Sequence, residues 1–265
     1  MFALALRRTM RPAQVASVPL IAALAALTVI HGMQNAQVRD HVGVLAAGML
    51  SPSLILMPLA ITLLTCVGFS SDLAHRFISV QRTRCDVPIL LCARFGSAIV
   101  VGFSLAFLYS FVAYVMSFHV WPLLGDPGID PAGYLLTPEQ AGDRAQHDEA
   151  FGSILAFGDL PFGIVYSSWF GFCGAVYAAM GIAACLVVRN RYLALSLPML
   201  TVFGETLLFE ILGHPHLALY FSTVPFGLEF HTDAQVVLPH LVLAAVVAVV
   251  AVVTVRRLPS SGRLS

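Results

Sequence analysis

Apolar stretches long enough to cross a lipid bilayer alternate with shorter polar stretches along almost the whole chain. A transmembrane helix needs about 20 mostly apolar residues, because the hydrocarbon core of a bilayer is about 30 Å thick. We therefore expect an all-α polytopic membrane protein, a single transmembrane domain over 1–265. By this measure the sequence predicts six spans, at about 15–33, 42–69, 95–119, 160–188, 192–212 and 236–255.

The run 213–233, between the fifth and sixth spans, is apolar, but we do not expect it to form a seventh span. Two prolines, Pro215 and Pro225, interrupt it, and acidic residues follow at Glu229 and Asp233. Non-helical backbone at membrane depth is tolerated only where protein covers it. We expect a pair of short re-entrant or interfacial helices here.

Charge sets the expected orientation. With six spans and both termini in the cytoplasm, the cytoplasmic side carries most of the arginines, as the positive-inside rule requires. The segment 121–159 is instead acidic and rich in Gly and Pro, so we expect an outer loop with a short surface helix near 139–150. The expected location is the cytoplasmic membrane. The cytoplasmic arginines in this topology are Arg7, Arg8, Arg11, Arg76, Arg82, Arg84, Arg94, Arg189, Arg191, Arg256, Arg257 and Arg263.

Before the first span, 1–14 begins with an apolar hexapeptide and then turns basic, which predicts an interfacial helix rather than a cleaved signal. In the second span, Pro52 and Pro58 are the expected kink points.

The longest structured polar interruption is 70–94. We expect a helix that begins near Ser70 or Ser71, with a serine as N-cap and Asp72 in the first turn, where the helix dipole favours an acid. Asp72 and Arg76 are spaced to pair at i and i+4. Pro88 is expected to end or kink this helix.

The same helix has an apolar stripe, because Leu73, Phe77 and Val80 fall at i, i+4 and i+7. Two interpretations remain open. The helix is either a basic element on the anionic leaflet surface or a coupling element that docks into a cytoplasmic motor, and the surrounding spans favour the second.

Composition excludes several classes. Only 11% of the residues are charged, whereas a typical soluble domain has about 25%. All 14 basic residues are Arg, so there is no lysine for a P-loop or a Schiff base, and ATP would have to be bound by another chain. A net charge of zero gives no indication of nucleic acid. None of the 5 cysteines falls in a predicted outer loop, so no disulfide framework is implied.

Taken together, six spans, an amphipathic lead-in, an Arg-rich segment between spans two and three, and broken helices before span six resemble the permease subunit of ABC transporters of the second exporter class. The sequence RTRCDVPILLCARFGSAIVVGF, at 82–103, is similar to that family's passage from the coupling helix into the third span. The loop 121–159 is longer than the family usually carries.

This resemblance implies a dimer of permeases, as a homodimer or heterodimer, bound to two cytoplasmic P-loop ATPase subunits. ATP and Mg²⁺ would bind to those partners, and this chain would hold no cofactor and perform no bond chemistry. The expected cargo is a lipophilic, peptide or glycan-type substrate. The ATPase-coupling residues would be Leu73, Arg76, Phe77, Val80, Arg82 and Arg84.

Glu205 and Glu210 are the carboxylates inside a predicted span. Five residues apart, they point about 140° apart around the helix, so they do not form one paired site. An acid in a span is a functional candidate. We expect Glu205 in the translocation cavity or the dimer seam, with a local structural hydrogen bond as the alternative, and Glu210 nearer the interface.

In the fourth span a small residue recurs every fourth position, which lets two helices approach closely. Packing within the chain and subunit association both remain open. These residues are Ser167, Gly171, Ala175, Ala179 and Ala183.

Two further functions remain as alternatives. One is an intramembrane enzyme using Glu205, Glu210 and outer histidines, although no Ser/His or H-E-x-x-H constellation lies on one span. The other is a non-transporting accessory or immunity subunit. Metal binding is not expected, although several side chains of suitable type occur at His214, His216, Glu229, His231 and Asp233.

Overall fold

The computed structural model describes residues 12–34, 36–74, 87–226 and 232–257, and regular structure in these ranges is helical apart from one isolated parallel bridge between Val38 and Ile129. The helices run in the order α2 Pro12–Met33, α3 His41–Met49, η1 Pro52–Leu56, α4 Met57–Ala74, α6 Val87–Val115, η2 Met116–Val120, α7 Trp121–Leu123, η3 Pro131–Tyr134, α8 Pro138–Asp148, η4 Gly152–Phe157, α9 Asp159–Val187, α10 Arg191–Ile211, η5 Pro215–Leu217, α11 Leu219–Thr223 and α12 Asp233–Arg257.

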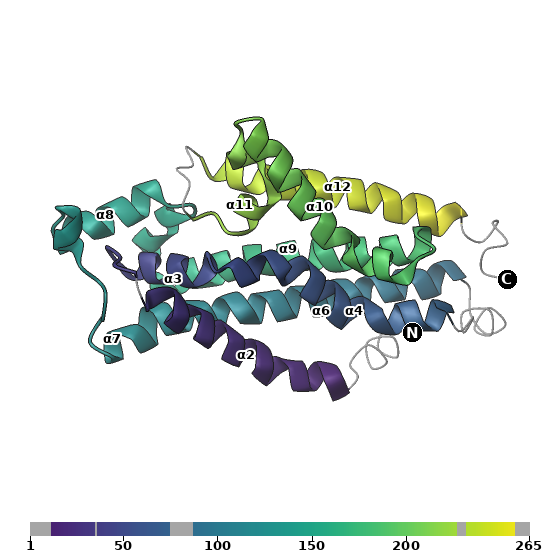
Figure 1. Cartoon of the computed structure of the whole chain (residues 1–265), viewed down its shortest axis with the longest axis horizontal. Helices are drawn as coiled ribbons and strands as arrows, with labels where there is room; N and C mark the ends of the chain where they lie inside the picture. Colours follow the sequence, from purple (N-terminus) through teal and green to yellow (C-terminus); the bar gives the residue numbers. More distant parts are fainter. Residues whose placement is uncertain (1–11, 35, 75–86, 227–231, 258–265) are drawn as a thin grey trace.

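Six helical stretches of the described chain are long and apolar enough to cross a bilayer, and they lie where the sequence predicts six spans. The protein is therefore a multi-pass membrane protein. Figure 1 shows these helices running along the long axis of the molecule. We call the end with α3, α7 and α8 the loop end, and the end with Ala74, Val87 and Arg257 the terminal end. The six stretches are Ala16–Met33, Leu54–Leu73, Val87–Leu123, Asp159–Val187, Arg191–Ile211 and Asp233–Arg256.

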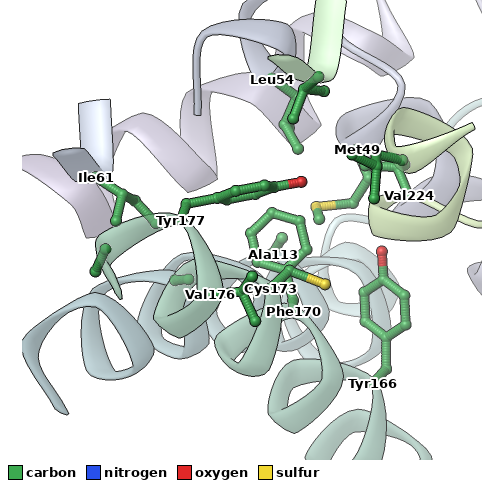
Figure 2. Close-up of a cluster of buried hydrophobic side chains, with 14 of the residues drawn as sticks. Met49, Leu54, Ile61, Ala113, Tyr166, Phe170, Cys173, Val176, Tyr177 and Val224 are labelled. Atoms are coloured by element: carbon green, nitrogen blue, oxygen red, sulfur yellow. The ribbon is translucent and has the colours of Figure 1, made fainter. Parts of the chain in front are cut away.

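Helix α9 is the centre of the bundle, since 72% of its spanning stretch is buried, against 17% of that in α12. Helices α4, α6, α10 and α12 all pack on it. Figure 2 shows Phe170, Cys173 and Tyr177 of α9 within the buried apolar cluster that fills the bundle.

Helices α6 and α9 pack most extensively, because glycines let their backbones meet. A Cβ on Gly174 would lie 2.5 Å from the Cβ of Ala106 and 2.7 Å from the carbonyl oxygen of Gly102. Nearer the loop end, the hydroxyl of Ser167 bonds to that of Ser110 on α6. The small residues of α9 thus include positions that pack within the chain.

The second span differs from the expectation of one kinked helix over 42–69. Helix α3 ends at Met49, and the chain resumes as η1 at Pro52 and as α4 at Met57. Proline lacks a backbone N–H and restricts the residue before it, so Pro52 and Pro58 stand at helix starts rather than at kinks.

The predicted helix start at Ser70 or Ser71 is wrong. Both serines lie inside α4, which continues to Ala74, so neither is an N-cap. The carboxylate of Asp72 accepts a hydrogen bond from Arg94 on α6 at 2.7 Å. The segment 75–86, which holds most of the predicted coupling helix, lies outside the described residues, and so do residues 1–11 of the interfacial helix expected over 1–14. Residues 12–14 belong to the start of α2.

The third span is longer than expected. It begins at Val87, with Pro88 in its first turn, rather than near Phe95. Together α6, η2 and α7 cover 37 residues, about 55 Å of helix, which exceeds the roughly 30 Å hydrocarbon core. A helix of this length is longer than the core is thick even at the usual tilt of about 20°.

The loop after the third span folds back onto the chain just before α3. The side chain of Arg39, just before α3, pairs with Glu149 at 2.7 Å and with Asp40 at 2.9 Å. Tyr134 donates its hydroxyl proton to the carbonyl of Gln37. The surface helix expected near 139–150 is α8, and it begins with a capping box at Thr137.

Candidate functional site: a buried polar cluster around a short helix

Helix α11 lies between the fifth and sixth spans and is only five residues long. It sits beside Glu205, about 9 Å before the end of α10, and beside His240, about 10 Å after the start of α12. Its residues Leu219, Ser222 and Thr223 are all buried. A short helix at this depth exposes many backbone groups that must find partners in the protein.

Side chains from two neighbouring spans bind the backbone of α11. The carboxylate of Glu205 on α10 accepts a hydrogen bond from the Leu219 amide at 2.9 Å, which satisfies the first N–H of the short helix. From α9, the indole of Trp169 donates to the carbonyl oxygen of Ser222 at 2.9 Å. Both ends of α11 are therefore fixed by long side chains.

His240 of α12 links the side chains of α11 to α9. Its Nδ1 atom lies 2.7 Å from the hydroxyl oxygen of Ser222, and its Nε2 atom lies 2.9 Å from the hydroxyl oxygen of Tyr177. That Tyr177 hydroxyl also lies 2.9 Å from the hydroxyl of Thr223. His240, Tyr177 and Ser222 are fully buried, so the cluster is closed to solvent.

The hydrogen-bond pattern assigns one tautomer to His240. The Ser222 hydroxyl donates to the carbonyl of Val236, so its oxygen is left to accept from Nδ1–H of His240. Nε2 is then an acceptor for the hydroxyl proton of Tyr177. A neutral imidazole with its proton on Nδ1 gives both ring nitrogens a partner, as a buried histidine requires. Tyr177 then shares its one proton between Nε2 and the Thr223 hydroxyl, because Thr223 donates its own proton to the carbonyl of Leu219.

This assignment decides what the cluster can do chemically. A serine nucleophile needs a histidine nitrogen that accepts its proton. Here Ser222 gives its proton to a backbone carbonyl, and His240 donates to Ser222 rather than accepting from it. The Ser222–His240 pair therefore has the arrangement of a clamp that joins α11 to α9 and α12.

The structure separates the two predicted intramembrane acids. Glu205 is half-buried and makes the bond to Leu219, which is the local hydrogen bond considered as the alternative to a cavity role. Glu210 is exposed near the end of α10. The two carboxylates thus have different surroundings, as their spacing predicts.

The outer histidines are only partly described. The rings of His214 and His216 meet edge to face with centroids 5.7 Å apart. Asp233 accepts a bond from the backbone of Phe151, while Glu229 and His231 lie outside the described residues. Within the described ranges no three His, Cys, Asp or Glu side chains are grouped so as to hold a metal ion.

Most of the predicted coupling residues cannot be placed, since Arg76, Phe77, Val80, Arg82 and Arg84 lie outside the described residues. Leu73 is described. It lies in the last turn of α4 and packs against the buried core.

The sequence did not single out His240 or the hydroxyl groups around it. One signal was available, because an ionisable residue within a span is rare and usually has a partner inside the bundle. His240 lies within the strongly apolar sixth span, so the reasoning that singles out Glu205 applies to it equally. Ser222 and Thr223 gave no signal, since hydroxyl groups are common in membrane segments.

The fold and this cluster define a class: an α-helical, multi-pass membrane protein with a short buried helix clamped between its last two spans. Comparisons of the chain with protein-family models, with curated proteins and with solved structures find no significant match. Function must therefore be argued from the molecule itself.

Proposed function

We propose that this chain is the permease subunit of an ATP-driven exporter, which moves a lipophilic, peptide or glycan-type substrate across the cytoplasmic membrane while a separate subunit hydrolyses ATP. The observation that supports this most is how segment 75–86 is attached to the bundle. The segment joins α4 to α6, and both of these helices pack on the central helix α9. An ion pair between Asp72, in the last turn of α4, and Arg94, two turns after the start of α6, ties these two helices together.

This anchoring suits a segment that transmits force. A partner that moves 75–86 would move α4 and α6 together, and α9 with them. Helix α9 carries Tyr177 and Trp169, which hold α11. In this proposal α11 is a re-entrant element, and ATP-driven motion reaches it through α9 as a rigid-body displacement.

The distribution of charge supports the proposed orientation. The described arginines at the terminal end are Arg94, Arg189, Arg191 and Arg256, whereas acidic side chains crowd the loop end. An excess of arginine marks the cytoplasmic side. The terminal end would face the cytoplasm, so 75–86 would be within reach of a cytoplasmic ATPase. Two copies, or one copy and a paralogue, would enclose the translocation path.

An intramembrane enzyme is less favoured, because Glu205 binds a backbone amide, Glu210 points elsewhere, and the Ser222–His240 pair lacks a base for the hydroxyl. A non-transporting accessory subunit differs from a permease in whether ATP turnover and substrate movement depend on it. The experiment must therefore measure the ATPase.

The test is copurification of a P-loop ATPase with the tagged chain from native membranes. Phe77→Ala should weaken copurification or uncouple hydrolysis, because a buried aromatic anchor can be worth about 2 kcal/mol or more. Phe157→Ala, an exposed aromatic at the loop end, is the matched control and should have no effect. If Arg76→Gln with Arg82→Gln instead releases the ATPase in a strongly salt-dependent way while Phe77→Ala does nothing, 75–86 is a lipid-surface element.

A further inference from the structure

A long groove runs between α6, α9 and α12 in the terminal half of the bundle. Its volume is about 740 Å³, within the range of about 300–1,000 Å³ that is usual for small-molecule sites. On each helix the lining residues recur at i, i+3, i+4 and i+7, over 92–99 of α6, 172–179 of α9 and 244–256 of α12. Each helix thus contributes one continuous face.

Small side chains on all three walls create this groove. Gly96 on α6, Ala175 and Ala179 on α9, and Ala248 and Ala251 on α12 all line it. Two of the small residues of the fourth span, Ala175 and Ala179, therefore face the groove.

One charged residue lines the groove, and it lies at the terminal end. Arg256 stands in the last turn of α12 with an exposed side chain. Within the described part of the chain, its guanidinium makes no hydrogen bond or ion pair. The remaining lining is apolar apart from the thiol of Cys92. An occupant that fits has an apolar tail and an anionic head.

The length of the groove matches one leaflet. From Ala244 to Arg256 the helix rises about 18 Å. Half of a hydrocarbon core of about 30 Å is about 15 Å. A lipid with its head at Arg256 would therefore place its acyl chains along the groove to the middle of the membrane. The apolar span of a second protein copy would bring no anion to Arg256.

We propose that this groove is a binding site for an anionic phospholipid of the terminal-end leaflet, with the phosphate on Arg256 and the acyl chains between α6, α9 and α12. Basic sites between transmembrane helices near the cytoplasmic surface are known to hold anionic lipid head groups. The site does not depend on the transport function proposed above.

Native mass spectrometry of the full-length chain in detergent tests the site, with dioleoylphosphatidylglycerol and dioleoylphosphatidylcholine as probes. The wild type should retain the anionic lipid in preference to the zwitterionic one. Arg256→Gln should weaken retention of phosphatidylglycerol about five- to tenfold and that of phosphatidylcholine less, because the choline cation offsets the charge of its phosphate. Arg191→Gln, another exposed arginine at the terminal end, is the control and should behave as the wild type.

A variant that fills the groove distinguishes a lipid occupant from a protein occupant. Ala248→Phe should abolish lipid retention, whereas Val249→Phe, on the exposed face of α12, should not. The proposal is overturned if the wild type binds both lipids equally, or if Ala248→Phe dissociates a dimer while lipid retention stays the same. In the latter case the groove seats a second copy.

A measurement on the wild type avoids any folding defect of these variants. Cys92 is exposed and lines the groove. Its alkylation by N-ethylmaleimide, followed by peptide mass spectrometry, should slow several-fold when phosphatidylglycerol is added and not when phosphatidylcholine is added. An unchanged rate with phosphatidylglycerol would contradict a lipid in this groove.

Discussion

Asp72 in the last turn of α4 and Arg94, two turns after the start of α6, form an ion pair of 2.7 Å between the two helices that segment 75–86 connects. Both side chains are partly buried, and the guanidinium also lies 5.9 Å from the ring centroid of Phe69. The pair therefore holds α4 and α6 together near the segment on which the proposed partner would act.

Breaking this pair should loosen the terminal end of the bundle. Asp72→Asn and Arg94→Gln should each lower the free energy of unfolding in detergent by about 1–2 kcal/mol, since a charged hydrogen bond is lost. In a double-mutant cycle the two changes should cost less together than the sum of their separate effects. Strict additivity would mean that the pair contributes nothing, and Arg191→Gln is the control for loss of an arginine.

The two fully buried tyrosines of α9 give a matched test of the polar clamp. Tyr177→Phe removes a hydroxyl bonded to His240 and should lower stability by about 1–2 kcal/mol. Tyr166→Phe removes a buried hydroxyl that has no partner in the described part of the chain, so it should be neutral or stabilising. Thermal unfolding in one detergent measures both. Equal losses would show that the hydroxyl bonds do not stabilise the clamp.

Glu205 should hold the first turn of α11. Glu205→Ala removes the acceptor for the Leu219 amide, so hydrogen exchange over 218–224 should accelerate. Glu205→Gln keeps an acceptor oxygen and should exchange as the wild type. Glu210→Ala, an exposed acid on the same helix, is the control.

The same variants separate a local role from a transport role. If Glu205→Gln preserves exchange but reduces ATP turnover by the partner, the charge itself matters for transport. Unchanged exchange in Glu205→Ala would mean that the bond to Leu219 does not stabilise α11.

Glu149 should give the loop end a distinct pH dependence. Burial raises the pKa of its carboxyl above the ordinary value, and the opposing effect of Arg39 is smaller. The folded state therefore binds this proton more readily than the unfolded state does. The contribution is fully present below the ordinary pKa near 4.5 and is lost as the pH rises through the raised value.

Glu149→Gln cannot ionise and isolates this effect. Its free energy of unfolding, minus that of the wild type, should increase as the pH rises from about 4 to 7. Chemical unfolding at several pH values measures the difference. A difference that decreases with pH would mean that the ion pair with Arg39 outweighs burial.

The sequence predicted the number of spans and their approximate positions, because a long apolar run is a local property. The sequence did not predict the helix ends and ion pairs that depend on segments far apart in the chain. Spacing rules suggest Arg76 as a partner of Asp72, and Arg76 lies outside the described residues. The partner that the structure shows, Arg94, is 22 positions away on another helix, which spacing along one helix does not predict. Ser70 resembled an N-cap, yet α4 continues past it as its apolar neighbours Phe69 and Leu73 pack on the core.

The candidate site was predictable only in part. Glu205 was identifiable, since a carboxylate within an apolar span is conspicuous. Its partner Leu219, and the grouping of His240 with Tyr177 and Ser222, depend on how α11 folds back between three spans. No periodicity in the sequence predicts that α11 packs between these spans.

If this chain works with a separate ATPase, the complex purified through this chain should hydrolyse ATP in a Mg²⁺-dependent way. In the wild-type complex a copurified P-loop protein should carry this hydrolysis. Phe77→Ala should remove the activity from the complex or uncouple it from the permease, while the Phe157→Ala complex should keep it. A complex from native membranes that contains no nucleotide-binding protein and hydrolyses no ATP would show that the chain does not work with an ATPase.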